Sequence, residues 1–269
     1  MKLGRELLVK PGKRVRFADF DADYTMGLES KDAAKETLTK NTSRLAELQY
    51  RLFAENKRAL LIVIQAMDAG GKDGTIRHVM SGMNPQSCKV MAFKAPSLEE
   101  LSHDFLWRIH KAMPARGEIG IFNRSHYEDV LIVRVHDIVP KSVWAKRYRQ
   151  INAFEQILAE NNVRMLKFFL LISKGEQKRR LESRLDDSTK NWKAQPEDFA
   201  ERRYWEAYTK AYEEALSRCS TPWAPWYVIP ANKKWFRNLA VSQIIIEALE
   251  EMRPKFPKPV LDPAKICVE

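Results

Sequence analysis

The stretch that decides the fold is residues 60–76, which read LLIVIQAMDAGGKDGTI. Its first five residues are all apolar and rich in β-branched side chains, as expected for a strand that is buried on both faces of a parallel sheet. Two glycines and a lysine follow, and the sequence after them has helical spacing. Strand, glycine loop, lysine and helix in this order predict a phosphate-binding loop at the N-terminus of a helix.

The loop departs from the common pattern G-x-x-x-x-G-K-[ST] at two positions. Ala66 replaces the first glycine, and Asp73 replaces the hydroxyl residue that binds magnesium. Asp68 supplies a carboxylate inside the loop, so we expect it to hold Mg²⁺ while Lys72 binds the transferred phosphate. The alternative is an ordinary Gly-Gly surface turn with an exposed lysine, and the preceding buried strand favours the phosphate loop. The residues expected to contact phosphate around it are Ala69, Gly70, Gly71, Asp73, Gly74 and Thr75.

Strand and helix patterns alternate on both sides of the loop. Further strands are expected at residues 89–93, 119–123, 165–172 and 226–229, with helical spacing between them. The alternation predicts βαβ units and an α/β fold with a doubly wound parallel sheet.

The rest of the chain divides around this sheet. We expect an N-terminal arm and a long helix in residues 1–56, with an extended basic arm at residues 1–20 and the helix from Ser30, then a phosphate-loop domain at 57–255 and a proline-rich tail at 256–269. Residues 174–215 are helical in pattern and highly charged, and they predict a helical lid inserted in the domain.

Composition narrows the possible partners. The 269 residues carry a formal net charge of +11, which favours polyanions such as nucleic acid, nucleotides, an acidic membrane or inorganic polyphosphate. No apolar stretch is long enough to cross a bilayer, and we expect a cytoplasmic protein that does not contact membranes. Cys88, Cys219 and Cys267 form no C-x-x-C pair, so neither a disulfide framework nor a zinc site is expected.

A second polar cluster follows the predicted strand at 119–123. Residues 117–130 read GEIGIFNRSHYEDV, and catalytic groups in open α/β sheets gather at such carboxyl ends of strands. Arg124 suits a phosphate, and Glu128 or Asp129 suits the metal or the nucleotide. The alternative is a polar loop with a surface ion pair. Arg134, in the apolar run 131–136, needs either a bound phosphate or a structural carboxylate as its partner.

The predicted lid carries a row of basic residues. Arg180 and Arg184 lie four residues apart on one helix face, which is mildly unfavourable unless an anion lies near both. Lys190 and Lys193 extend this surface. The alternative is a solvated amphipathic helix whose charges are balanced by acidic neighbours.

Six segments together resemble the polyphosphate kinase 2 family over nearly the whole chain, from about residue 14 to residue 255. They read MDAGGKDGTI, FNRSHYEDVLIVRVH, KRRLESRL, STKNWK, DFAERRYWEAY and APWYVIPANKKWFRN. The resemblance implies a P-loop fold like that of nucleoside monophosphate kinases, with a parallel sheet, flanking helices and a helical lid. It also implies transfer of the terminal phosphoryl group between inorganic polyphosphate and a nucleotide, with Mg²⁺ or Mn²⁺ as cofactor.

The same resemblance implies roles for single residues. Asp68 would bind magnesium and Lys72 phosphate, and Arg124 and Arg134 would contact phosphates. Arg180, Arg184, Lys190 and Lys193 would form the lid and channel surface. Asn123 stands at the second metal-ligand position, where many members have aspartate, and Glu128 replaces an asparagine.

The Asn-Arg-Ser-His-Tyr-Glu-Asp form is similar to the class III subgroup, whose members convert AMP through ADP to ATP, reversibly. A homodimer or homotetramer is implied. The alternatives are an ATP-dependent nucleotide kinase and a P-loop nucleic-acid-binding ATPase. No recognised nucleic-acid-binding module is present in the sequence, so nucleic acid is not the expected partner.

Overall fold

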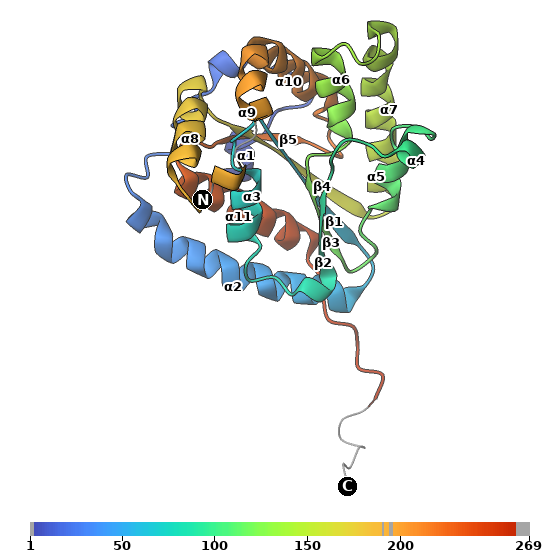
Figure 1. Ribbon diagram of the computed structural model, residues 1–269. Coiled ribbons are helices and arrows are strands. Elements are labelled where there is room, and N and C mark those ends of the chain that lie inside the picture. The colour runs from blue at the N-terminus through green and yellow to red at the C-terminus, as the bar shows by residue number, and fades with distance from the viewer. Residues whose placement is uncertain (1–2, 190, 194–195, 262–269) are drawn as a thin grey trace.

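A five-stranded sheet lies at the centre of the computed structural model, which describes residues 3–189, 191–193 and 196–261. Its strands run in the order β2-β3-β1-β4-β5, and every neighbouring pair is parallel (Figure 1). Their bounds are β1 Ala59–Ala66, β2 Cys88–Ala92, β3 Ile119–Asn123, β4 Val163–Leu171 and β5 Trp226–Pro230. The predicted α/β fold with a parallel sheet is confirmed.

The central strand β1 sends side chains into two apolar layers. Leu60, Ile62 and Ile64 face one layer, whereas Leu61 and Val63 face the other, and all five are fully buried. This alternation over an unbroken apolar run is what a strand covered on both faces requires.

Helices cover both faces of the sheet. The apolar layer that contains Leu60, Ile62 and Ile64 is covered by α2 (Lys31–Glu55), α3 (Lys72–Val79) and α11 (Lys234–Met252). The opposite layer is closed mainly by α7 (Lys141–Glu160) and α10 (Trp205–Cys219). The predicted long helix before β1 is confirmed as α2.

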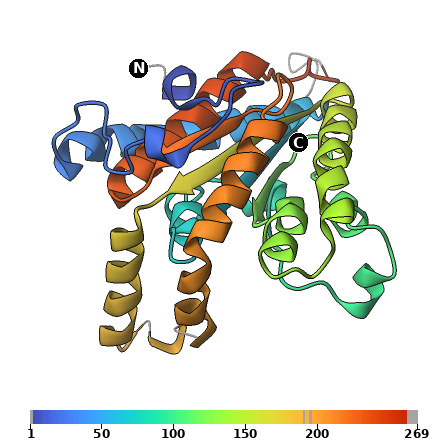
Figure 2. The ribbon, with the colours of Figure 1, turned by 90° about the horizontal axis from the view of Figure 1, so that it is seen from above.

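The lid region is helical, as predicted. It comprises α8 (Lys174–Asp186), η4 (Asn191–Lys193), α9 (Pro196–Ala200), η5 (Glu201–Tyr204) and the start of α10. Figure 2 shows α8 and the α9–α10 segment extending side by side away from the sheet. Such a projecting helical pair is suited to covering a site at the sheet edge.

The shorter elements join these units. They are η2 (Pro85–Ser87), α4 (Leu98–Leu101), α5 (Trp107–Lys111), η3 (His126–Val130) and α6 (Ile132–Val135). The helix α11 ends at Met252, and residues 253–261 contain no helix, as the prolines predict. In the part of the chain that the structure describes, no helix combines the length and apolarity that a membrane span needs. Cys88 and Cys219 are free thiols, and Cys267 lies outside the described residues.

The prediction of an extended N-terminal arm was partly wrong. The arm contains α1 (Leu3–Leu7) and η1 (Phe17–Asp19), because Leu3 and Leu7 are four residues apart and bury against the core. Between them, Leu8 forms a β-bridge with Tyr227, and the backbone N–H of Val9 donates to the carbonyl of Trp226 at 2.8 Å, before the chain turns at residues 11–12. The arm therefore lies along the edge strand β5.

Candidate active site

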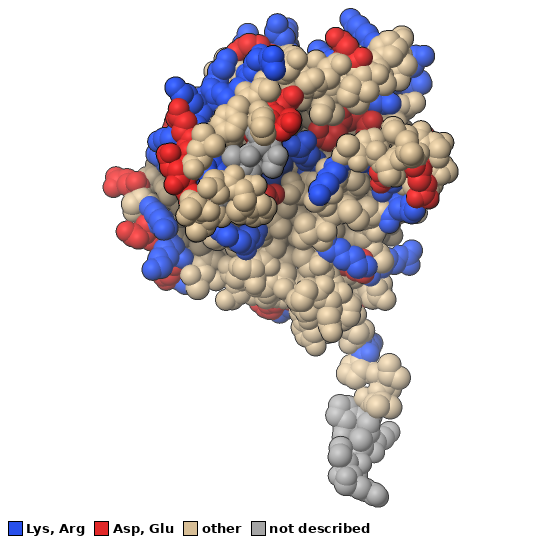
Figure 3. Space-filling view, in the orientation of Figure 1, with Lys and Arg blue, Asp and Glu red and all other residues tan. Residues whose placement is uncertain are grey.

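A cavity of about 1930 Å³ lies at the carboxyl ends of β1 and β3. The phosphate loop, Glu128 and Asp129 of η3, and the lid helix α8 contribute to its lining. Figure 3 shows Lys and Arg side chains gathered over the upper part of this face, whereas the lower part is mostly uncharged. The predicted site residues therefore meet where open α/β sheets bind their ligands.

The phosphate loop connects β1 to α3 in a tight turn. Gly71 precedes the helix with φ of 98°, a conformation that glycine adopts without strain. A Cβ at Gly70 would lie 2.5 Å from Cβ of Ala66, so this position also requires glycine. Lys72 curls back over the loop, and its Nζ donates to the carbonyl of Ala66 at 3.2 Å. Burial and the nearby Arg124 charge lower the pKa of Lys72.

Most of the predicted loop residues line the cavity. They are Asp68, Ala69, Gly70, Gly71, Lys72, Asp73 and Gly74. Thr75 was predicted to contact phosphate, but its side chain is buried and donates to the carbonyl of Gly71 at 3.0 Å. Thr75 is not among the lining residues, because the first turn of α3 directs its hydroxyl back onto the helix.

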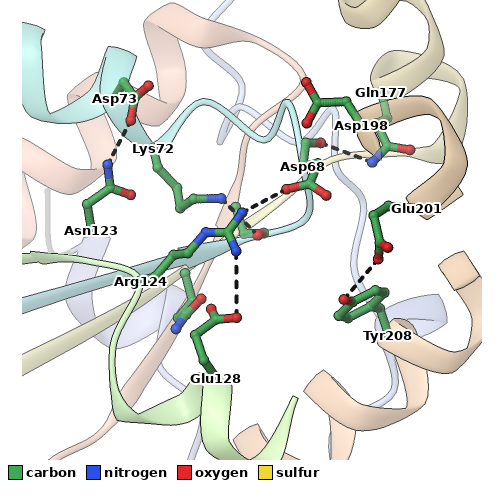
Figure 4. A network of polar contacts seen from close by, with 12 residues as sticks. Asp68, Lys72, Asp73, Asn123, Arg124, Glu128, Gln177, Asp198, Glu201 and Tyr208 are labelled. Atoms are coloured by element: carbon green, nitrogen blue, oxygen red, sulfur yellow. Dashed lines mark hydrogen bonds and ion pairs between the residues drawn. The ribbon is translucent and has the colours of Figure 1, made fainter. Parts of the chain in front are cut away.

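Arg124 links the two predicted clusters (Figure 4). Its Nη2 lies 3.1 Å from Oδ1 of Asp68, and its Nη1 lies 3.8 Å from Oε2 of Glu128. Burial opposes its charge, but Glu128 and Asp68 outweigh burial and raise its pKa. The guanidinium is thus held between two carboxylates at the floor of the cavity.

Asn123 has a different partner. Its Nδ2 donates to Oδ1 of Asp73 at 2.7 Å, which ties the end of β3 to the start of α3. The predicted metal ligands Asp68 and Asn123 therefore lie in the same cavity but contact different residues (Figure 4). In the described ranges, no group of three or more His, Cys, Asp or Glu side chains is arranged to hold a metal ion.

Arg134 lies apart from the residues above. Its Nη1 donates to Glu214 at 2.6 Å and to the hydroxyl of Tyr148 at 3.2 Å, and its guanidinium lies over the ring of Trp144. It is not among the residues that line the cavity. The partner of Arg134 is therefore a structural carboxylate, that of Glu214, and not a phosphate bound at the phosphate loop.

The lid helix touches the phosphate loop. Nη1 of Arg180 donates to the carbonyl of Ala69 at 3.0 Å, and its Nε donates to Glu176 at 2.6 Å. Burial and the adjacent Arg179 lower the pKa of Arg180 to about 10. Arg184 pairs with Asp198 at 3.0 Å, and both line the cavity.

The other two predicted lid cations are not placed. Lys190 lies outside the described residues. Lys193 ends the short helix η4, and its side chain is outside the described part.

The lining residues fall into two groups according to the part of the chain that carries them, and we call these groups walls. The basic wall comes from α3, α8 and α11, and its cations besides Lys72 are Arg77, Arg179, Arg180, Arg184, Lys234 and Arg237. The apolar wall comes from residues 92–108 and 129–147, and its apolar side chains include Phe93, Phe105, Ile132, Val133, Ile138 and Val139.

The apolar wall also carries two arginines that the sequence did not single out. The guanidinium of Arg108 lies 5.5 Å from the ring centroid of Phe93, and that of Arg147 lies 4.8 Å from that of Phe105. Arg147 also pairs with Asp129 at 3.0 Å, and burial raises the pKa of Asp129 even beside this arginine.

Gln177 and Arg237 were also missed by sequence reasoning. Nε2 of Gln177 donates to the carbonyl of Asp68 at 3.0 Å, which fixes the lid helix to the loop. Arg237 is 2 % exposed and lines the cavity beside Gly71. A signal was available for Arg237, because an arginine in the apolar segment WFRNLAV needs a partner, as does Arg134 in its apolar run.

A buried polar network includes two residues of the second polar cluster, residues 117–130. Nζ of Lys167 donates to Glu155 at 2.5 Å, to the hydroxyl of Tyr127 at 2.8 Å and to the carbonyl of Cys219 at 2.7 Å. A ring nitrogen of His126 lies 3.2 Å from the same glutamate. Because His126 and Tyr127 directly follow Arg124 and Ser125, the network anchors the segment that presents Arg124 and Glu128.

Comparison with known proteins gives one consistent family. A model of the family described as Polyphosphate kinase 2 (PPK2) matches residues 28–257. The AMP/ADP-polyphosphate phosphotransferase of Meiothermus ruber is 50% identical over 262 residues, which are 97% of this chain and 98% of that protein. The ADP-polyphosphate phosphotransferase of Rhodopseudomonas palustris is 46% identical over 266 residues, and the match covers 94% of this chain and 92% of that protein.

A solved structure agrees with these relatives. The crystal structure of Polyphosphate Kinase 2 from Arthrobacter aurescens superposes with a TM-score of 0.94 at 46% identity, covering 97% of this chain and 94% of that one. The resemblance that the six sequence segments indicated is confirmed along almost the entire chain. The chain belongs to the polyphosphate kinase 2 family.

Proposed function

We propose that this protein transfers the terminal phosphoryl group of inorganic polyphosphate to AMP and ADP, giving ADP and ATP, and that the transfer is reversible. One observation carries the proposal. A single cavity holds Asp68, Lys72 and Arg124 together with a basic wall and a largely apolar wall. The name of the Meiothermus ruber relative, of which 98% is covered by the match, supports AMP and ADP as acceptors.

The two walls suggest how the substrates bind. Polyphosphate carries charge on every unit, so a wall with Arg179, Arg180 and Arg184 attracts it at several points. A nucleoside suits the apolar wall, where Phe105 and Val139 offer apolar contact. The acceptor phosphate and the donor end would then meet at the phosphate loop.

We assign Mg²⁺ as the cofactor, with Mn²⁺ as the alternative. Magnesium in phosphotransferases is bound by one or two carboxylates together with substrate phosphates and water, so it does not need a three-residue protein site. Asp68 lies in the loop and lines the cavity, and its oxygen chemistry fits this need. When bound, the ion would neutralise charge on the transferring phosphoryl group. Asn123 is assigned to orienting Asp73 through their 2.7 Å hydrogen bond.

The residues of the chain act by position and charge. An oxygen of the acceptor phosphate attacks the terminal phosphorus of polyphosphate, the bond from that phosphorus to the bridging oxygen breaks, and the shortened chain leaves with the bond electrons. Lys72 and Arg124 stabilise negative charge on the transferring group. Because the attacking oxygen is already ionised, no general base is needed.

Transfer assays separate this proposal from its nearest alternative, an ATP-dependent nucleotide kinase. The protein is incubated with Mg²⁺, AMP or ADP, and either long-chain polyphosphate or ATP as donor, and the nucleotides are separated by chromatography. We expect ADP and ATP to form from polyphosphate in the absence of added ATP. Phosphorylation of AMP by ATP alone, with no product from polyphosphate, would favour the alternative.

We also propose a homodimer or homotetramer, on the basis of the family resemblance. Light scattering coupled to size-exclusion chromatography tests this, and a monomeric mass at assay concentrations would contradict it.

A further inference from the structure

Arg237 is a buried arginine that has no carboxylate partner in the part of the chain that the structure describes. Its side chain is 2 % exposed, and its Nε and Nη2 donate to Oδ1 of Asn238 at 3.1 and 2.8 Å. Within the described residues, no Asp or Glu forms an ion pair with it. Burial and the neighbouring Arg180 lower the pKa of Arg237 to about 10, so it still carries its charge at neutral pH.

The guanidinium of Arg237 lies directly over the phosphate loop. A Cβ at Gly71 would lie 2.1 Å from Nη1 of Arg237 and 3.4 Å from Nη1 of Arg180. A Cβ at Gly74 would lie 3.4 Å from Nη2 of Arg237. The two arginines, from α11 and α8, therefore converge at the N-terminus of α3, and both line the cavity.

This arrangement calls for an anion on physical grounds. A buried charge without a counter-charge is costly, and proteins normally pair it. Here the charge faces the N-terminus of the eight-residue helix α3, which itself favours an anion. Arginine is suited to phosphate because its planar group donates two parallel hydrogen bonds.

We propose that Arg237 and Arg180 form a phosphate subsite over Gly71, and that it binds a phosphate of the polyphosphate donor. This inference rests on the proposed function. The donor is chosen over the nucleotide because both arginines belong to the basic wall, together with Arg179 and Arg184, and not to the apolar wall. The donor phosphate supplies the counter-charge that Arg237 lacks among the residues described in the structure.

Binding measurements without catalysis test the subsite. Calorimetry measures the Kd of inorganic tripolyphosphate and, separately, of AMP for the wild type, Arg237→Met and Arg164→Met. Arg164 is the second residue of β4, at the opposite end of the sheet, and it pairs with Glu251, so its variant controls for the loss of one positive charge. We expect Arg237→Met to bind tripolyphosphate at least about tenfold more weakly, the scale of a lost hydrogen bond to a charged group. We expect AMP binding in Arg237→Met, and tripolyphosphate binding in Arg164→Met, to stay within about twofold of wild type.

Chemical denaturation without ligand gives a second readout. Arg237→Met should be at least as stable as the wild type, because an unpaired buried charge has been removed, and tripolyphosphate should stabilise it less than it stabilises the wild type. If Arg237→Met fails to fold, the claim that Arg237 carries an unpaired buried charge in the free protein is wrong. The variant Arg237→Lys keeps the positive charge but not the planar guanidinium. A higher Kd for tripolyphosphate in this variant would support bidentate binding of phosphate by Arg237.

Three other outcomes overturn the claim. An unchanged Kd for tripolyphosphate in Arg237→Met excludes the subsite. Weakened AMP binding with normal tripolyphosphate binding would assign the arginine to the nucleotide instead. A wild-type protein that binds no tripolyphosphate would overturn the proposed function itself, and the subsite with it.

Discussion

Replacing Lys167 with methionine is expected to destabilise the protein strongly. The lysine and Glu155 are both fully buried, and their closest atoms are 2.5 Å apart. Methionine has a similar length but no charge, so Glu155 would keep a buried negative charge with only His126 and Tyr127 beside it. Breaking a buried ion pair in this way costs about 3–5 kcal/mol. At about 2–4 °C per kcal/mol for a chain of this size, the melting temperature should fall by roughly 6–20 °C.

Guanidinium unfolding followed by tryptophan fluorescence measures this loss. The double variant Lys167→Met/Glu155→Gln removes the stranded charge, so it should be more stable than Lys167→Met alone. Arg164→Met, which breaks a partly exposed pair with Glu251, should change the free energy of unfolding by less than about 1 kcal/mol. The reasoning is refuted if Lys167→Met costs less than about 1 kcal/mol, or if the two core substitutions are simply additive.

Three further predictions concern the phosphate loop and acid stability. Asp68→Ala and Lys72→Ala should each reduce the transfer rate at least about a hundredfold, the scale of one preorganised electrostatic contact, and near-normal initial rates in both would mean that the loop has been misassigned. Gly71→Ala should lose about 1–3 kcal/mol in chemical denaturation, because its φ is 98° and the new Cβ would meet Arg237 at 2.1 Å. Gly12→Ala is the matched control, since its φ is 76° but no atom lies within 4 Å, and an equal loss in both variants would leave backbone strain as the whole effect. Burial opposes ionisation of Glu155, but Lys167 and His126 outweigh burial and lower the pKa of Glu155. The ionised Glu155 therefore stabilises the fold above the ordinary carboxyl pKa range, and this stabilisation is lost as the pH falls through the lowered pKa. Glu155→Gln should therefore show a shallower fall in unfolding free energy on acidification, and identical acid limbs would contradict this.

The sheet and the phosphate loop could be predicted because their signals are local. A strand buried on both faces must be apolar along its length, and the loop after β1 must combine glycines with a lysine. The residues of β3 were predicted with the observed bounds for the same reason. The polar cluster after β3 was placed correctly at the cavity because carboxyl ends of parallel strands share one edge.

Other features depend on contacts between distant parts of the chain. Arg237 reaches Gly71 only because the last helix packs back beside α3, and no local pattern encodes that approach. Lys167 lies within an apolar strand, and its partner Glu155 is on the preceding helix, where it looks like an ordinary surface acid. Arg134 carried the same signal as Arg237, an arginine among apolar residues, and only the fold decides that one meets a carboxylate and the other the phosphate loop.

The most direct test of the central claim follows the phosphoryl group itself. Polyphosphate labelled throughout with ³²P is mixed with unlabelled AMP and Mg²⁺, and glucose with hexokinase removes any ATP as it forms. The account predicts that label enters the β-phosphate of ADP from the start of the reaction, and that Lys72→Ala slows this at least about a hundredfold. Label that reaches ADP only when ATP is supplied, or an unchanged rate in Lys72→Ala, would contradict direct transfer from polyphosphate at this loop.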